Sequence, residues 1–437
     1  MPPVKVSDVE YFEPDGTALL GFWLDHPEPE STSDVHALNF EGWALGRDGP
    51  AVALQVSGSG LGTVSLPIGF PRPDVAELHP KVRWAAHGAG FRAGVGTLGL
   101  PRQFELLLSV ELQDRRTVPL ATIRGRRELL ASGNDQSGPQ PLLVTTVGRS
   151  GSSRVMELLG RHPRIVAYPP WRLEVKTASY WSEVLLALGG PASYLQPVTS
   201  AQRSPQWWLG QGRQFDERPD TDPAIERLLG STQVRDAARF CRARINRFYR
   251  QVARSTGKQK PRYFAEKCVP RSPAYAQILR EIYPSAREIF LVRDFRDVLC
   301  SIISFTDRLG YPWFGRDRVR TDEEYVRQIL GPQCQVLTRG WNERSESAYL
   351  LRYEDLVLEP KGTLRSLFSH LSLGRGDRLL ELLLDTPSDE RREEYRHGTS
   401  ATAEASIGRW KKDLDGSQKR VCKEVFGEAL ATFGYST

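Results

Sequence analysis

The sequence predicts two structural classes in one chain: an all-β sandwich over residues 1–125, and an α/β domain over residues 141–437. Short β-rich runs separated by turn residues recur in the first region, which is typical of antiparallel sandwiches. Residues 126–140 are polar and rich in glycine, serine and proline, and we interpret them as a linker. From residue 141 onward, strand-like runs alternate with helical patterns, which predicts a parallel sheet flanked by helices.

The N-terminal region contains seven strand-like runs, at residues 4–12, 18–24, 35–44, 51–56, 62–67, 104–112 and 116–123. Residues 72–91 interrupt this pattern, and we expect one short helix there. His79, Trp84 and His87 lie in that segment, and structural roles explain them more simply than a site does. The region contains no catalytic constellation, which favours an accessory role.

The α/β region has its own order of elements. Its main strands are expected at residues 142–146, 262–267, 289–292 and 349–353. Helices are expected at residues 155–159, 234–255, 274–282, 297–305, 322–341, 360–373, 377–384 and 418–433. Ligands of such sheets bind at the carboxyl ends of the strands, so these ends are where we expect the site.

Composition excludes several classes of protein. The chain has no run of about 18 apolar residues, so we expect no membrane span. Its five cysteines are scattered without a CxxC pair or zinc spacing, which favours reduced thiols in the cytoplasm and no metal. The net charge of +6 is spread along the chain, whereas nucleic-acid binding needs a clustered basic face, so we expect no nucleic-acid partner.

A strand, a glycine turn and a helix follow one another at residues 142–159. The turn reads GRSGSS and comprises Gly148, Arg149, Ser150, Gly151, Ser152 and Ser153. Glycines let the backbone approach an anion, and the amides and dipole at a helix start favour negative charge. We therefore predict a P-loop-like phosphate cradle. A plain tight turn between a strand and a helix is the alternative.

This cradle differs from that of nucleoside triphosphatases. Their loop needs a lysine, then serine or threonine, after the second glycine, with magnesium on the hydroxyl. Here Ser152 follows Gly151, and the cation is Arg149, before that glycine. A nucleotide-dependent kinase or triphosphatase is therefore the second hypothesis for function, not the first.

A second motif lies at residues 288–301, EIFLVRDFRDVLCS, where Arg293 ends a buried strand and Ser301 follows eight residues later in a helix. With both motifs in place, the chain resembles the sulfotransferase family that uses 3'-phosphoadenosine 5'-phosphosulfate (PAPS). In having arginine at this position of the turn, the chain is similar to the carbohydrate and protein-tyrosine branches of that family. FAEKCVP, LLRYEDLVLEP and SIGRWKKDL resemble its other motifs, so the resemblance extends over roughly residues 141–435.

The resemblance implies a role for each motif. Residues 148–153 would bind the 5'-phosphosulfate, and Arg149 would stabilise charge on it. Arg293 and Ser301 would bind the 3'-phosphate. The C-terminal cofactor loop would comprise Ser406, Gly408, Arg409 and Trp410, although its usual pattern of basic residues and glycine is altered and Trp410 could equally pack the core. Lys267 could add a second cation near the sulfuryl group or could be a surface lysine.

The reaction implied is an in-line displacement at sulfur that yields PAP and needs no metal, with a base that removes the acceptor proton. Glu174 is the nearest carboxylate after the His162-Pro163 pair that follows the cradle, and it is the first candidate for that base. His397, in a loop before the C-terminal motif, is the second candidate.

The expected acceptor is a hydroxyl-bearing small molecule, glycan or glycolipid. LNFEGWALGRDGP at residues 38–50 resembles β-sandwich modules attached to bacterial sugar-active transferases, which implies an accessory role such as acceptor recognition. A carbohydrate-binding protein with an inert transferase domain is the third hypothesis. The presence of Arg149, Arg293 and Ser301 argues against it.

Overall fold

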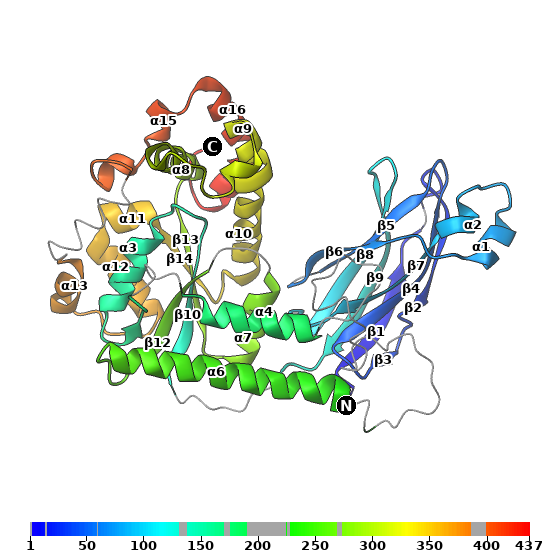
Figure 1. Ribbon diagram of the computed structural model, residues 1–437, viewed down its shortest axis with the longest axis horizontal. Coiled ribbons are helices and arrows are strands. Elements are labelled where there is room, and N and C mark those ends of the chain that lie inside the picture. Colours follow the sequence, from blue (N-terminus) through cyan, green and yellow to red (C-terminus); the bar gives the residue numbers. More distant parts are fainter. Residues whose placement is uncertain are drawn as a thin grey trace. The chain divides into compact units, whose positions relative to one another are not determined.

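The computed structural model describes residues 2–13, 15–58, 60–130, 138–169, 175–189, 224, 228–268, 273–385 and 399–437. The chain forms two compact units (Figure 1). Unit 1 consists of residues 1–134, 179–244 and 272–284, and unit 2 of residues 135–178, 245–271 and 285–437.

Unit 1 contains two antiparallel sheets. The six-stranded sheet has the order β3-β1-β9-β8-β5-β6, and the three-stranded sheet has the order β2-β4-β7. Their strands are β1 (Val4–Tyr11), β2 (Leu19–His26), β3 (Thr32–Ser33), β4 (Ala37–Gly46), β5 (Ala51–Gly58), β6 (Gly62–Pro67), β7 (Gly90–Gly96), β8 (Gln103–Leu112) and β9 (Thr117–Arg127).

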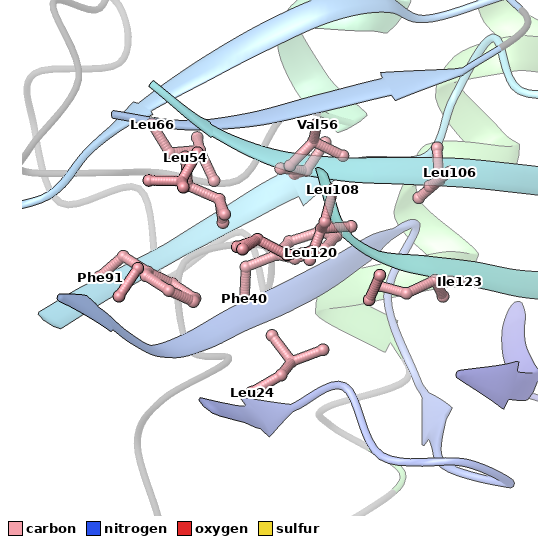
Figure 2. Close-up of a cluster of buried hydrophobic side chains, with 14 of the residues drawn as sticks. Leu24, Phe40, Leu54, Val56, Leu66, Phe91, Leu106, Leu108, Leu120 and Ile123 are labelled. Carbon is pink, nitrogen blue, oxygen red and sulfur yellow. The ribbon is translucent and has the colours of Figure 1, made fainter. Parts of the chain in front are cut away.

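One hydrophobic cluster joins the two sheets of unit 1, as expected of a sandwich. Figure 2 shows Leu24 and Phe40 of the smaller sheet beside side chains of the larger one, among them Leu108. Strand β8 shows why the sequence folds this way, since buried residues from Phe104 to Leu112 alternate with more exposed ones over most of its length. The predicted N-terminal sandwich is confirmed.

All seven predicted runs contain strands, and two strands were missed. Strand β7 reads GFRAGVG, and its three glycines lower strand propensity, although β7 pairs with β4 over its whole length. The single helix expected at residues 72–91 is wrong. Two short helices form there, α1 (Pro73–Leu78) and α2 (Ala85–Gly88). Pro80 lies between them, and α1 ends before it because proline disfavours the helical conformation at the preceding residue.

Unit 1 also includes segments that follow the predicted linker, among them part of α4 (Thr177–Gly189), the first half of α6 (Gln233–Ser255) and α7 (Pro273–Ile282). Arg127 at the end of β9 forms a buried ion pair with Glu281 of α7. The Leu130 amide also donates to Glu281, at 2.9 Å. The boundaries at residues 125 and 141 stay a prediction.

Unit 2 contains a five-stranded parallel sheet with the order β11-β12-β10-β13-β14. Its strands are β10 (Gln140–Thr145), β11 (Ile165–Val166), β12 (Tyr263–Cys268), β13 (Arg287–Val292) and β14 (Tyr349–Arg352). The predicted α/β fold class is therefore confirmed.

Helices cover both faces of this sheet, and β13 shows the division. Ile289 and Leu291 pack with α3 (Ser152–Arg161), α11 (Tyr353–Leu358), α12 (Pro360–His370) and α13 (Asp377–Leu384). Phe290 and Val292 pack with α8 (Phe295–Leu309), α10 (Gly331–Arg344) and α16 (Gly416–Thr432). Because both faces are buried, the central residues of β10 and β13 are continuously apolar, which made these two strands recognisable in the sequence.

The remaining elements are short. They are η4 (Leu228–Thr232), η5 (Arg316–Arg318), α9 (Asp322–Tyr325), η6 (Val326–Leu330), η7 (Glu404–Ser406) and α15 (Trp410–Asp413). Helix α8 begins two residues before the predicted start because Asp294 caps it, accepting from the Arg296 amide at 3.0 Å. In the part of the chain that the structure describes, no helix is both long and apolar enough to cross a membrane.

The order of strands places the two sequence motifs together. Strand β10 lies between β12 and β13. The next two strands of the chain, β11 and β12, lie on one side of β10, and the last two, β13 and β14, lie on the other side. In register, Thr145 at the end of β10 pairs with Phe290 of β13. The glycine turn after β10 and Arg293 after β13 therefore lie at the same edge, where open α/β sheets bind ligands.

Candidate functional site

The glycine turn after β10 has a backbone that few residues can adopt. Arg149 and Gly151 both have positive φ angles, 67° and 85°. A Cβ atom added to Gly151 would lie 2.3 Å from Cδ2 of Tyr353. Glycine is thus required at residue 151 by its backbone angle and by the close approach of Tyr353.

The start of α3 is suited to an anion. Its N-cap is Gly151, which provides no capping side chain, and the first turn contains no acidic residue. The amides of that turn and the helix dipole are therefore directed at the space beyond the helix. Ser150 is fully buried, and its Oγ has no hydrogen-bond partner among the described residues. A buried hydroxyl without a partner is costly, and an anion at the turn would satisfy it.

Arg149 leads from the turn toward the second motif. Its Nε donates to Ser301 Oγ at 3.2 Å, and its Cζ lies 4.4 Å from the Phe305 ring centroid. Burial, then the charges of Arg293 and Arg308, lower the pKa of Arg149 to about 10. The guanidinium is still charged at neutral pH, and a bound anion would offset the repulsion among these arginines.

Arg293 connects three segments. Its guanidinium donates to the carbonyl oxygens of Arg149 (3.2 Å) and Ser406 (2.7 Å), and its Cζ lies 4.8 Å from the Tyr353 ring centroid. The residue is 5% exposed, and its Nε has no partner in the described part of the chain. The two carbonyl oxygens are neutral, and the Asp297 carboxylate that interacts with Arg293 also accepts two backbone amides, so the unpartnered Nε favours an anionic ligand.

Ser301 lies on α8, between the two arginine-bearing segments. It is 1% exposed, accepts the bond from Arg149, and shares a hydrogen bond with Thr399 Oγ1 at 3.1 Å. The structure therefore joins Arg149, which was predicted for the 5' end, to Ser301, which was predicted for the 3'-phosphate, through one hydrogen bond.

The C-terminal loop is held by Asp297 of α8, which sequence reasoning missed. Its carboxylate accepts from the amides of Gly408 (2.6 Å) and Trp410 (2.9 Å). Burial raises the pKa of Asp297, and the two amide bonds oppose that shift. Gly408 has a φ of 70°, so a left-handed residue allows both amides to face one carboxylate.

Two residues of that loop have different surroundings. Arg409 donates to Ser304 Oγ at 2.8 Å and to the Thr399 carbonyl at 3.0 Å, and so lies beside Ser301 on α8. The ring of Trp410 is covered by the guanidinium of Arg296, whose Cζ lies 3.9 Å from its centroid. Trp410 also packs against the cluster under α8 and α16, which agrees with the packing alternative.

The other predicted residues are less closely placed. Lys267 is half-buried near the end of β12, and its Cα is the register partner of Val144, so it lies at the same sheet edge. Glu174 and His397 lie outside the described residues.

Tyr353 is the most informative residue that the sequence reasoning left without a role. It closes on Gly151, lies under Arg293, and its hydroxyl is 3.3 Å from Ser406 Oγ. It belongs to the LLRYEDLVLEP motif, so the motif marked its importance but not its contacts. Phe305 and Thr399 lie outside the motifs, so nothing in the sequence marked them.

A wall of aromatic residues adjoins the turn. A Cβ atom added to Gly148 would lie 3.0 Å from the Phe314 ring, and Phe314 lies 5.9 Å from Phe305 between ring centroids. Tyr311 and Trp313, on the same loop, are exposed.

Among the described residues, no group of three or more His, Cys, Asp or Glu side chains could hold a metal ion.

Comparison with known proteins gives a family. A family model described as the sulfotransferase family matches residues 141–377, more than half of the chain. A search of curated protein sequences found no match.

Solved structures of sulfotransferases are similar at low identity. The sulfotransferase domain of the curacin biosynthetic pathway is 16% identical (TM-score 0.36), over 65% of this chain and 97% of that one. A sulfotransferase from Alicyclobacillus acidocaldarius is 14% identical (TM-score 0.36), over 68% and 94%. A mouse sulfotransferase complexed with PAP is 12% identical (TM-score 0.36), over 68% and 87%. Because TM-scores below 0.5 carry no weight, the family assignment depends on the family model.

We expect Gly151→Ala to destabilise the protein. A left-handed alanine costs about 1–2 kcal/mol, and its methyl group would also overlap the Tyr353 ring. Urea unfolding should give a lower midpoint than wild type. Gly416→Ala is the control, because a Cβ atom there meets nothing within 4 Å. Equal midpoints for Gly151→Ala and wild type would show that the turn is not held as described.

Proposed function

Because the chain belongs to the sulfotransferase family, we propose that it transfers the sulfuryl group of PAPS to a hydroxyl of a small-molecule or glycan acceptor. One observation carries the donor assignment. A helix start suited to an anion and a buried arginine with an unpartnered Nε lie at one sheet edge, joined through Arg149 and Ser301. A donor with phosphates at both its 5' and 3' positions fits two adjacent anion positions. A donor with a single phosphate chain, such as a nucleoside triphosphate, needs only one anion position.

The residues divide between the two ends of the donor. The amides of residues 150–153 and the Ser150 hydroxyl would hold the 5' end, since they lie at the start of α3. Arg293 and Ser301 would hold the 3'-phosphate, because both are buried where β13 passes into α8. Arg409 lies beside Ser301 and would support the same end.

PAPS supplies an activated sulfuryl group whose leaving group is the 5'-phosphate of PAP. Negative charge grows on that phosphate and on the sulfuryl oxygens, so cations placed there in advance lower the barrier. Arg149 is the residue suited to this role. It stays protonated at neutral pH, so it stabilises charge and does not donate a proton.

The aromatic wall supports a ring-bearing acceptor. Tyr311 and Trp313 are exposed, with ring centroids 5.7 Å apart, and the neighbouring Phe314 contacts the turn at Gly148. Exposed aromatic faces of this kind pack against sugar rings and other apolar rings, while a hydroxyl of the acceptor stays free to react.

The base that removes the acceptor proton is proposed to be Glu174, with His397 as the second candidate. Glu174 follows the glycine turn by about twenty residues and is the nearest carboxylate after the His162-Pro163 pair. The kinase or triphosphatase alternative is less favoured because Ser152 stands where those enzymes carry lysine.

A cytoplasmic location is also a proposal, supported by five buried cysteines that form no disulfide.

The two arginines should affect different kinetic constants. Arg293→Ala should mainly weaken PAPS binding, because the 3'-phosphate is remote from the reacting sulfur. Arg149→Ala should mainly lower kcat, by about 10²–10³-fold, as for other groups that stabilise transition-state charge. Steady-state kinetics with PAPS varied would measure both. Arg318→Ala is the control, since Arg318 is exposed. The reverse pattern would mean that the two phosphate positions are exchanged.

Glu174→Gln keeps the shape of the side chain and removes its basicity. If Glu174 is the base, kcat should fall by at least about 10²-fold, while PAP affinity should be unchanged because no phosphate contact is lost. Glu183→Gln, an exposed carboxylate on α4, should leave both values unchanged. A Glu174→Gln enzyme within about threefold of wild type would contradict the assignment, and His397→Ala would then be measured in the same way.

A further inference from the structure

A second cavity lies within unit 2, at the edge of the sheet opposite the candidate site. Its volume is about 710 Å³. The first residues of β10, β12 and β13 line it, namely Gln140, Tyr263 and Arg287. Parallel strands start at one edge and end at the other, so the six residues of β10 separate this cavity from the glycine turn by about 20 Å.

The lining of this cavity is strongly basic. It includes Arg164, Arg250, Arg254, Lys260, Arg262 and Arg287, together with Lys258, and the described residues of the lining include no aspartate or glutamate. None of these seven cations forms an ion pair with a carboxylate in the described part of the chain. They come from different elements, so one helix dipole does not explain them. Only Arg254 lies in the last turn of a helix, where a cation complements the dipole.

Two of the cations help to build the cavity wall. Lys258 Nζ donates to the carbonyl oxygens of Gly160, His162 (2.9 Å) and Ile165. Arg262 donates to the Ser372 carbonyl at 2.9 Å. Burial lowers the pKa of Lys258 to about 8, so it is still mostly charged at neutral pH.

The other five cations have no side-chain partner among the described residues. Arg164, Arg250, Arg254 and Lys260 are exposed and Arg287 is half-buried. Several like charges at one cavity repel one another, which lowers the stability of the fold unless an anion binds between them. Arginine predominates, and its planar fork matches the oxygens of phosphate and sulfate groups.

The size and lining indicate the class of ligand. A volume of about 710 Å³ is in the range of small-molecule sites, whereas a nucleic-acid surface would extend further. The only aromatic residue of the lining is Tyr263, which is 2% exposed and so offers no platform on which bases could stack. We infer that this cavity is a second anion site, which binds a small molecule bearing several phosphate or sulfate groups while the donor site is separately occupied.

The test is calorimetric titration of the full chain, saturated with PAP, with two probes. Inorganic pyrophosphate represents the phosphate source, and a heparin-derived tetrasaccharide represents the sulfated glycan. At least one probe should bind with one equivalent per chain. Whichever binds more tightly identifies the source of the anion.

The triple variant Arg250→Gln, Arg254→Gln and Lys260→Gln should weaken that binding by at least about tenfold, because each charged hydrogen bond contributes on that order. All three side chains are exposed, so folding should be unaffected. The control is Arg378→Gln, Arg420→Gln and Lys423→Gln, which removes the same charge from exposed positions on α13 and α16 and should bind as wild type.

Three results would overturn the inference. The first is that neither probe binds the PAP-saturated chain. The second is that the control variant loses as much affinity as the test variant. The third is that a 16-nucleotide oligomer binds more tightly than both probes and that the same triple variant weakens its binding, which would make this a nucleic-acid surface. The inference does not depend on the proposed function. If the chain fails to bind PAP, the same titrations without PAP still test it.

Discussion

The buried guanidinium of Arg293 is the interaction on which the candidate site depends. It holds the carbonyl oxygens of Arg149 and Ser406 and lies against Tyr353, so residues far apart in the chain meet at one cation. Tyr353 in turn occupies the space that a side chain at residue 151 would need. The glycine turn, the end of β13 and the C-terminal loop therefore form one connected structure, and the Nε of its buried cation is left for an anion to bind.

The sequence was sufficient for the fold because its signals were local. The central residues of β10 and β13 are continuously apolar, and the alternation along β8 predicts a half-buried strand. Where local signals were weak the prediction failed. Strand β7 contains three glycines and is stabilised by its pairing with β4, and the short helices at residues 72–91 are separated by Pro80. Tertiary pairing outweighed propensity at β7, whereas at residues 72–91 the local stop signal of Pro80 was not applied.

The candidate site was predictable only in part, for the same reason. Arg149, Arg293 and Ser301 follow from motif spacing, and the order of strands brings them together. Asp297 and Tyr353 act through contacts with residues more than fifty positions away, so the motifs around them do not show those contacts. The two ends of the unit 2 sheet also differ in a way that sequence alone hides. The cations of the second cavity come from separate segments and gather only in the folded chain.

The central claim is that the site holds two phosphates of one ligand, at the 5' and 3' positions. Titration calorimetry without metal, comparing PAP with ADP, tests it most directly. The two ligands carry similar charge but place the second phosphate differently. We predict that PAP binds at least about tenfold more tightly than ADP, since a charged hydrogen bond to Arg293 contributes on that order. Equal affinity for PAP and ADP would contradict it.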